Sequence, residues 1–405
     1  MKILFFSDHF KPEPSAPAAH VYERAQMWCE SGHDVTVICA APNFPEGKVY
    51  EGYKNRWRFI EKLDGIRVVR VKTLIVPNSG FALRILDYLS YAVSAFVIAL
   101  FEPKPDVVVS TSPHLFVPVA AAAFAGVKGC PHVMEVRDLW PASIVAVEAL
   151  KKGLGYRLLE RLELHLYRVA KRILVLTGSF KKDLEQRGVD PAKIHVVLGG
   201  ANLELFSPRS KDPGIVHALQ IGDSFVVGYL GTLGLAHGLE NVLAAAELLR
   251  QEKVVFLIVG DGAARGYLDE IIRRRRIDNV LLLPRKLREE MPAYLSVCDV
   301  SLIHLKDRKV FSKVIPSKIF ESMAMGIPIL YVGPRGEGVD IVEAHGAGEW
   351  VRPEDPAALA SAVVKLRNDG TRRNLLACNA EKAAPLYSRR LQAEGTLSVL
   401  SKAIG

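Results

Sequence analysis

The stretch VVFLIVG, from Val254 to Gly260, is apolar at six consecutive positions and ends on a glycine. A strand with one face in water alternates apolar and polar residues, whereas a strand covered by helices on both faces is apolar throughout. The stretch therefore predicts a buried strand of a parallel sheet. Helical patterns separate it from similar short runs on either side.

Eleven further runs have this short, β-branched or apolar character, and longer helical patterns lie between them. This alternation predicts an α/β protein of βαβ units and doubly wound sheets. The other predicted strands are Lys2–Ser7, Asp34–Ala40, Ile66–Lys72, Asp106–Thr111, His132–Asp138, Arg172–Thr177, His195–Leu198, Phe225–Gly231, Val280–Pro284, Val300–Leu305 and Pro328–Val332.

A chain of 405 residues is too long for one ordinary core, so two domains are expected. The segment from Gly199 to Gly222 is rich in glycine, proline and polar residues, and a new buried strand follows it. We therefore expect one Rossmann-like domain over residues 1–200 and another over 201–385. The final helical pattern, within residues 386–405, could pack on either domain.

The chain carries a formal charge of +9, which favours anionic partners such as phosphate-bearing ligands, an anionic membrane or nucleic acid. No nucleic-acid-binding signature accompanies the charge, so nucleic acid is not expected. The five cysteines are scattered and form no C-x-x-C pair, which argues against a zinc site and fits a reducing cytoplasm. The first residues are apolar over too short a run for a signal peptide.

Loops after the strands are the places to seek a site, because ligands of open α/β sheets bind outside the carboxyl ends of the strands. Gly228, Gly231 and Gly234 form a glycine-spaced turn after one strand, where backbone N–H groups can meet a phosphate. An ordinary tight turn explains the spacing equally well. Arg285, after another strand, is a candidate for the same site or part of a solvated helix start.

The segment VFSKVIPSKIFESMAMGIPIL, residues 310–330, contains the start of a predicted helix. Ser317 is a good cap for it, and Lys318 adds a cation where free N–H groups already favour an anion. Lys313 and Lys318 bracket the helix start, an arrangement that the helix dipole alone does not favour. We therefore predict a diphosphate between this helix start and the glycine turn, with Glu321 accepting hydrogen bonds from ribose hydroxyls.

In the first domain, Arg137 and Asp138 end an apolar strand, which makes them catalytic candidates or a structural Arg–Asp pair. His114 follows another strand and is either a site residue or part of a helix start. The first loop brings Asp8 and His9 to the same edge of the predicted sheet.

The segment Phe81–Phe101 is strongly apolar, and its polar residues recur every three or four positions as one narrow stripe. Its uncharged part is too short to span a bilayer. It is either a buried helix of a soluble core, which periodicity slightly favours, or a helix lying in the membrane interface. The polar stripe consists of Arg84, Asp87, Ser90 and Ser94.

Over essentially its whole length the chain resembles the family 4 retaining glycosyltransferases of the GT-B fold. The similarity is greatest to the bacterial branch that builds O-antigen, capsule and colanic-acid polysaccharides, fucosamine transferases included. It is carried, in order, by MKILFFSDHFKPE, GHDVTVI, PNFPEGKVYEGYK, DGIRVVRV, EVRDLWP, GANLELF, GYLGTLGLAHGLENVLAAAELL, FLIVGDG and PSKIFESMAMGIPIL.

The resemblance implies two Rossmann-like domains facing across a cleft, with a nucleotide-sugar donor, commonly UDP-linked, on the second domain. It implies retention at the anomeric carbon, no metal held by a D-x-D motif and no other cofactor. Glu321 matches the second glutamate of the family's E-x7-E signature and would bind the ribose. Gly231 and Gly234 would face the diphosphate, the Arg285–Leu287 loop would hold the base, and Asp138 would lie near the reacting sugar. The last helix would cross back to the first domain.

Three departures from the family pattern shape the expected site. Lys313 stands where the signature has its first glutamate, and Thr232 and His237 stand where relatives often carry the arginine and lysine of the donor loop. Ser15–Ala16–Pro17 replaces the paired glycines of the first loop. Positive charge for the leaving diphosphate would then come from Lys313 and Lys318.

These features lead us to expect a glycosyltransferase on the cytoplasmic face of the plasma membrane, held there peripherally through residues 81–101. It would move a sugar, an N-acetylated amino sugar being one option, from a UDP-sugar to a saccharide or a polyprenyl-diphosphate-linked acceptor. Asp138 and Lys313 are the predicted catalytic residues, and His9, His114 and Arg137 are the candidates on the acceptor side.

Three other functions are alternatives for a fold of this kind. A UDP-sugar epimerase of GT-B fold would act without an acceptor. A dinucleotide-dependent oxidoreductase needs G-x-G-x-x-G and a paired acidic residue, which this sequence lacks. The third is a non-catalytic nucleotide- or membrane-binding protein; a membrane scaffold alone would leave the polar cluster of the second domain without a purpose.

Overall fold

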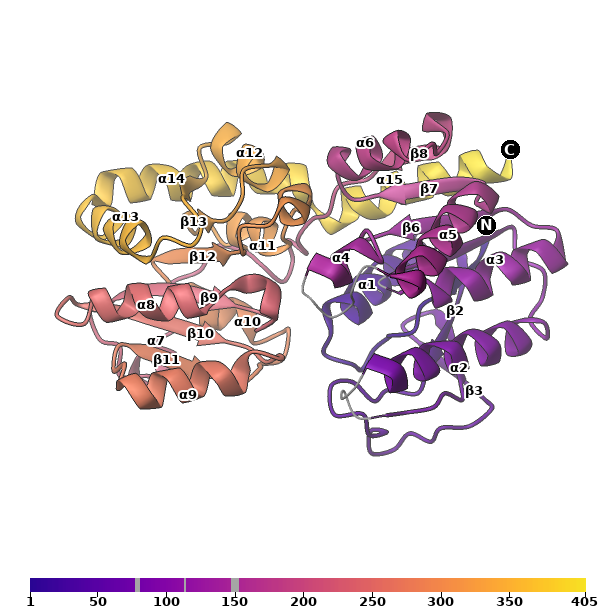
Figure 1. The fold of residues 1–405 in the computed structure, drawn as a ribbon, viewed down its shortest axis with the longest axis horizontal. Helices are drawn as coiled ribbons and strands as arrows, with labels where there is room; N and C mark the ends of the chain where they lie inside the picture. The colour runs from indigo at the N-terminus through magenta and orange to yellow at the C-terminus, as the bar shows by residue number, and fades with distance from the viewer. Residues whose placement is uncertain (77–80, 113, 147–152) are drawn as a thin grey trace. The chain divides into compact units, whose positions relative to one another are not determined.

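The apolar runs of the sequence form the strands of two sheets, each in its own unit of the chain (Figure 1). One unit contains Met1–Leu198 together with Arg390–Gly405, and the other contains Gly199–Arg389. The computed structural model describes residues 1–76, 81–112, 114–146 and 153–405.

The first sheet has the strand order β3-β4-β2-β1-β5-β6-β7-β8, and all its pairs are parallel except β3 with β4. The edge strand β3 was not predicted, because it is largely exposed and lacks the buried apolar pattern. The strands are β1 (Lys2–Phe6), β2 (Asp34–Ala40), β3 (Arg58–Leu63), β4 (Ile66–Val71), β5 (Val107–Thr111), β6 (His132–Val136), β7 (Arg172–Val175) and β8 (Ile194–Val196).

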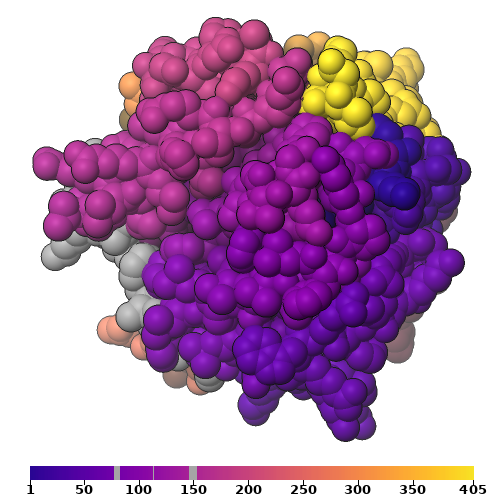
Figure 2. Space-filling view, turned by 90° about the vertical axis from the view of Figure 1, so that its right-hand side faces the viewer, coloured from indigo at the N-terminus to yellow at the C-terminus, as the bar shows by residue number. Residues whose placement is uncertain are grey.

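Helices cover both faces of this sheet. On one face α1 (Ala16–Glu30) packs with α15 (Arg389–Ile404), and the Trp28 indole N–H donates to the Ala393 carbonyl at 3.1 Å. Right-handed crossovers put α2 (Phe81–Ala99), α3 (Phe116–Lys128) and α5 (Leu154–Val169) on the other face, where α3 packs against both neighbours. The last helix therefore belongs to the first unit, and Figure 2 shows its yellow end beside the indigo N-terminus.

The second sheet has the strand order β11-β10-β9-β12-β13-β14, all parallel. The strand β10 contains all of the stretch Val254–Gly260 except its last residue. Five of its six side chains are buried, as its apolar pattern predicts. β14 was not predicted, because its sequence GEWV has no apolar run and only its two end residues are buried. The strands are β9 (Phe225–Leu230), β10 (Val254–Val259), β11 (Val280–Leu283), β12 (Val300–His304), β13 (Ile329–Val332) and β14 (Gly348–Val351).

The helices α8 (Glu240–Leu248), α9 (Arg265–Arg275) and α13 (Pro356–Asn368) share one buried apolar cluster with this second sheet. The chain enters and leaves the unit side by side, since the Ala201 amide donates to the Tyr387 carbonyl at 2.9 Å and the Arg389 amide to the Ala201 carbonyl at 2.8 Å. The remaining helices are α4 (Ala142–Ala146), α6 (Gly178–Gln186), η1 (Pro191–Lys193), α7 (Pro213–Ala218), η2 (Leu235–His237), α10 (Met291–Ser296), η3 (Lys309–Lys313), α11 (Lys318–Ala324), α12 (Glu337–Ala344), α14 (Gly370–Ala383) and η4 (Ala384–Tyr387).

None of the helices in these described ranges combines the length and the apolar content that crossing a bilayer requires.

Candidate active site

Each sheet has a topological switch point, where the chain leaves two neighbouring strands in opposite directions. In the second sheet these strands are β9, which leads to β10, and β12, which leads to β13. The crevice outside the carboxyl ends of such strands is the usual ligand site of an open α/β sheet. Gly231 directly follows β9, and the connection from β12 to β13 contains Lys313, Ser317 and Lys318.

Gly231 is a position that only glycine occupies without strain. Its φ is +136°, and its amide donates to the Val259 carbonyl at 2.8 Å. A Cβ atom here would lie 2.7 Å from Cε and 2.9 Å from Nζ of Lys318. The missing side chain therefore lets the Lys318 ammonium approach the backbone of the turn.

The Lys318 ammonium lies 4.8 Å from the centre of the Tyr229 ring. Within the ranges that the structure describes, no carboxylate lies at ion-pair distance from it; the Glu321 carboxylate instead lies 3.4 Å from Nη1 of Arg288. Burial lowers the pKa of Lys318 to about 8, although Glu321 acts in the opposite direction. A desolvated cation beside a glycine turn is a favourable place for an anion.

Two histidines next to this turn are neutral at pH 7. Nδ1 of His304 donates to the His237 carbonyl at 2.6 Å and joins η2 to the end of β12. Burial and the nearby Lys318 lower the pKa of His237 to about 3, and burial lowers that of His304 to about 4. His237 therefore does not replace the missing cation of the donor loop. Thr232, in the same turn, accepts a hydrogen bond from the Tyr229 hydroxyl through its carbonyl, at 2.7 Å.

Ser317 occupies the N-cap position of α11, but the prediction that its side chain caps the helix is wrong. Its backbone is already helical, with φ −60° and ψ −24°, and no hydrogen bond joins its side chain to the first turn. A capping side chain reaches the amides of that turn from an extended backbone. Only its carbonyl takes part, accepting from the amides of Phe320 at 3.1 Å and Glu321 at 3.2 Å.

The other predicted donor residues lie on separate loops at this edge of the sheet. Gly234 precedes η2, and Lys313 is the last residue of η3. Arg285 and Leu287 follow β11; Leu287 is 61% exposed, and its amide donates to the Glu290 carboxylate at 2.8 Å.

The switch point of the first sheet lies between β1 and β5. Asp8 and His9 follow β1, His114 follows β5, and the Asp8 carboxylate lies 3.2 Å from Nε2 of His114. The His114 ring stacks on Tyr88 of α2 at 3.9 Å. The structure thus brings the first-loop residues and His114 together. Nδ1 of His9 bonds to the Glu13 carboxylate at 2.6 Å.

The charges of this cluster depend on one another. Burial alone would lower the pKa of His9, but the Glu13 carboxylate raises it to about 9, so the imidazole is protonated at neutral pH. Burial lowers the pKa of His114, although Asp8 opposes the shift. Burial and the charge of Asp8 raise the pKa of Asp87 to about 7.

Arg137 and Asp138 follow β6, the strand next to β5. Among the described residues the Arg137 guanidinium hydrogen-bonds to Nδ1 of His20, and the alternative of a structural Arg–Asp pair is supported only by the attraction between the two charges. The Arg137 amide donates to Oγ of Ser112 at 2.9 Å. Burial raises the pKa of Asp138, while Arg137 acts in the opposite direction.

Known protein families match both parts of the chain. Residues 15–200 match the glycosyl transferase 4-like domain, and residues 216–383 match the glycosyl transferases group 1. Both units are glycosyl transferase domains. Their parallel sheets and their structural neighbours identify the architecture as GT-B, the expected α/β fold class.

Curated relatives of these glycosyl transferase domains come from bacteria. The probable glycosyltransferase WbjE of Pseudomonas aeruginosa is 30% identical over 238 residues, 58% of this chain and 59% of the relative. The putative colanic acid biosynthesis glycosyl transferase WcaI of Escherichia coli (strain K12) is 27% identical over 271 residues, 64% of this chain and 65% of the relative. The alignments thus span about three fifths of each relative. A crystal structure of Anabaena Alr3699/HepE in complex with UDP and glucose aligns over 99% of this chain and 100% of its own, with a TM-score of 0.73 and 17% identity.

Several residues next to the candidate site residues of the two glycosyl transferase domains were not predicted from the sequence. Tyr229 lies inside a buried strand, so the sequence predicts a core residue, although its ring packs against Lys318. Asp87 lies on a helix whose sequence is mostly apolar, so it was not predicted to belong to a site. Glu13 had a signal, since it stands four residues after His9 in the first loop. Among the described residues no group of three or more His, Cys, Asp or Glu is arranged to hold a metal ion.

Proposed function

We propose that this chain transfers a sugar from a UDP-sugar to a saccharide acceptor during synthesis of a bacterial surface polysaccharide, with retention at the anomeric carbon. The acceptor we propose is carried on a polyprenyl diphosphate at the inner face of the plasma membrane. Support comes from the two glycosyl transferase domains and from relatives named as glycosyltransferases, one of them in colanic acid biosynthesis. The UDP bound in the similarly folded HepE structure supports the choice of nucleotide.

The observation that carries the proposal is the position of Lys318 beside Gly231. Breaking the bond between sugar and phosphate builds negative charge on the departing diphosphate, and a fixed cation stabilises that charge as it develops. The Lys318 ammonium has no carboxylate at ion-pair distance among the described residues and has already lost much of its hydration. Its interaction with an incoming phosphate is therefore strong, since little water screens it.

Other residues receive roles in the same proposal. Glu321 accepts hydrogen bonds from the ribose hydroxyls, while Arg288 holds its carboxylate in place from 3.4 Å. The loop of Arg285 and Leu287 holds the base, and Lys313 adds a second positive charge near the phosphates. The reaction we propose needs no metal ion.

On the first unit we propose that Asp138 lies near the reacting sugar and that His9, His114 and Arg137 contact the acceptor. The protonated His9 and the buried Asp8–His114 pair form a polar patch at the switch point, which suits sugar hydroxyls. An N-acetylated amino sugar is the first donor sugar to test.

The test is release of UDP from a panel of UDP-, GDP- and ADP-sugars, with and without polyprenyl-diphosphate saccharides. We expect UDP release that depends on an acceptor and a product that keeps the anomeric configuration of the donor. The proposal is refuted if the protein binds none of these nucleotide sugars. A changed UDP-sugar formed without any acceptor would instead identify an epimerase.

A further inference from the structure

The helix α2 turns an apolar side toward water. Five of its side chains, Leu83, Leu86, Leu89, Val93 and Val97, are between 40% and 62% exposed. Within the described side chains of this helix, the one other exposed residue is Arg84. A surface helix of a soluble domain normally presents polar residues to water and buries its apolar stripe.

The polar stripe predicted on this helix runs from the exposed Arg84, through the half-buried Asp87 and Ser90, into the unit. Ser94 is buried, and Oγ of Ser90 accepts from the Leu74 amide at 2.7 Å while donating to the Asp87 carbonyl. The side of the helix that lies away from the exposed apolar residues packs into the unit through buried residues such as Tyr91. The interpretation of this segment as a buried helix is therefore correct in part: α2 contributes to the core and also exposes an apolar stripe, and its position in a membrane interface stays a prediction.

A second amphipathic stripe lies on α5. Leu154, Leu158 and Val169 are at least half exposed, and their spacing places them on one side of the helix. Three exposed arginines, Arg157, Arg161 and Arg168, run along the adjoining side. Apolar residues bordered by arginines are typical of helices that lie in a membrane interface.

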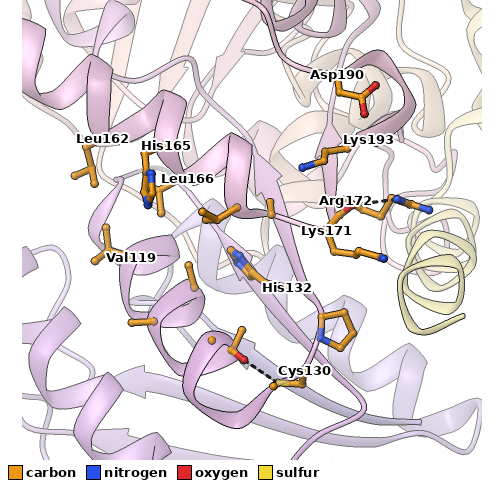
Figure 3. Close-up of a pocket in the computed structure, with 18 of the residues that line it drawn as sticks. Val119, Cys130, His132, Leu162, His165, Leu166, Lys171, Arg172, Asp190 and Lys193 are labelled. Carbon is orange, nitrogen blue, oxygen red and sulfur yellow. Dashed lines mark hydrogen bonds between the residues drawn. The ribbon is translucent and has the colours of Figure 1, made fainter.

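Between these helices lies α3, whose exposed residues are Ala123, Gly126 and Val127. A groove of about 840 Å³ separates α3 from α5, and Figure 3 shows Val119, Leu162 and His165 around one end of it. Among the described residues that α2, α3 and α5 expose, none is acidic. We call this surface of α2, α3 and α5 the helix face.

We propose that the helix face docks the protein on the surface of an anionic phospholipid bilayer. The apolar stripes and the groove would enter the boundary between headgroups and acyl chains, and the arginines of α5 would contact lipid phosphates. Positive charge without any exposed acid on the three helices favours an anionic lipid surface over a mixed-charge protein partner. The inference deepens the proposed function, because it brings the enzyme to the surface that holds a lipid-linked acceptor.

The first experiment removes apolar contact without touching the core. The double variant Leu86→Ser, Val93→Ser is compared with the control Leu248→Ser, Leu375→Ser, which alters two exposed leucines of the second unit. Binding is measured by flotation with vesicles of phosphatidylcholine containing 30% phosphatidylglycerol, without any donor. We expect at least a tenfold loss of binding for the helix-face variant and wild-type binding for the control.

The second experiment removes positive charge. The triple variant Arg157→Gln, Arg161→Gln, Arg168→Gln is compared with Arg273→Gln, Arg274→Gln, Arg275→Gln, which removes equal charge from the exposed end of α9. At low salt we expect the α5 variant to lose up to about fivefold in vesicle binding per arginine, and the α9 variant to lose little. Binding of the wild type should also weaken in high salt and on vesicles of pure phosphatidylcholine.

Three results would overturn the inference: no binding of the wild type to anionic vesicles, equal losses in the helix-face and control variants, or a helix-face variant that changes the oligomeric state while vesicle binding stays constant. The last result would identify the helix face as a subunit interface. Binding of UDP to the same variants, measured separately, distinguishes failure of this inference from failure of the proposed function. Unchanged thermal unfolding shows that each variant is folded.

Discussion

Replacing Lys318 with methionine should raise the stability of the free protein and weaken its binding of UDP. The ammonium is charged at pH 7 in a place where burial opposes the charge, which lowers its pKa from the ordinary 10.5 to about 8. This shift corresponds to about 3 kcal/mol by which the folded state disfavours the charged form. Methionine has nearly the same length and no charge, so the variant should gain up to about 3 kcal/mol in free energy of unfolding at pH 7.

The dependence on pH gives the effect a sign that can be checked. The unfolded chain keeps the proton of Lys318 up to about pH 10.5, whereas the folded chain releases it above about pH 8. Between about pH 8 and pH 10.5 the free energy of unfolding of the wild type should therefore rise relative to that of the variant. At the upper end of this range the two proteins should be equally stable. Urea unfolding at pH 7, 9 and 10.5 measures this difference.

Binding should change in the opposite direction. A charge-assisted hydrogen bond to phosphate contributes about 1.5–3 kcal/mol, so the Lys318→Met variant should bind UDP about 10- to 150-fold more weakly. Uridine, which has no phosphate, should bind both proteins alike by calorimetry. The control is Lys309→Met, an exposed lysine of the same connection. Equal losses for UDP and uridine, or a variant less stable than wild type at pH 7, would refute the reasoning.

Three further substitutions test other parts of the structure. Gly231→Ala places a Cβ against the lysine ammonium at a φ of +136°, so we expect a loss of about 1–3 kcal/mol in stability and weaker binding of UDP in calorimetry. Glu135→Gln leaves the buried Arg24 guanidinium, now bonded at 2.6 and 2.8 Å, without a counter-charge, and should cost about 3–5 kcal/mol in urea unfolding. Glu13→Gln should abolish the stability that the His9 imidazolium gives, which is complete below pH 6.5 and lost as pH rises through about 9.

Controls for these substitutions come from the same chain. Gly266→Ala, in a helix with open space around the added Cβ, should not reduce stability, in contrast to Gly231→Ala. The wild-type carboxylate of Glu135 has its pKa held at about 2 because Arg24 outweighs burial, so its contribution is present above pH 4.5 and lost as pH falls toward 2. A wild type whose stability is constant from pH 4.5 to 2.5 would contradict that pairing.

The apolar runs predicted most strands because burial on both faces leaves little choice of residue. All six residues of β9 are buried, and its run was recognised from sequence alone. The hairpin of β3 and β4 was missed although Asp64–Gly65 forms its turn with positive φ at both residues, because the exposed edge strand shows no apolar periodicity. Burial constrains the residues of an exposed strand such as β3 only weakly, so its sequence carries less information about its structure.

The sequence predicts that the candidate site residues follow the ends of strands. Which of these residues meet depends on the order of the strands in the sheet. Gly231 and Lys318 are 87 positions apart, and they meet because β9 and β12 are neighbours in the sheet. A linear pattern does not contain that adjacency. It also does not show which side of a helix faces the sheet, which is why the sequence left α2 open between a core helix and a helix at a membrane interface.

The paired entry and exit of the second unit make it an insertion within the first. Because Ala201 is hydrogen-bonded to Tyr387 and Arg389, a short linker from Leu198 to Arg390 should close the first unit over the missing segment. The protein cut after residue 200 would lose α15 and uncover Trp28. We therefore expect the second unit to be exchangeable as a cassette, and the first unit can be studied on vesicles without it only if its last helix is kept.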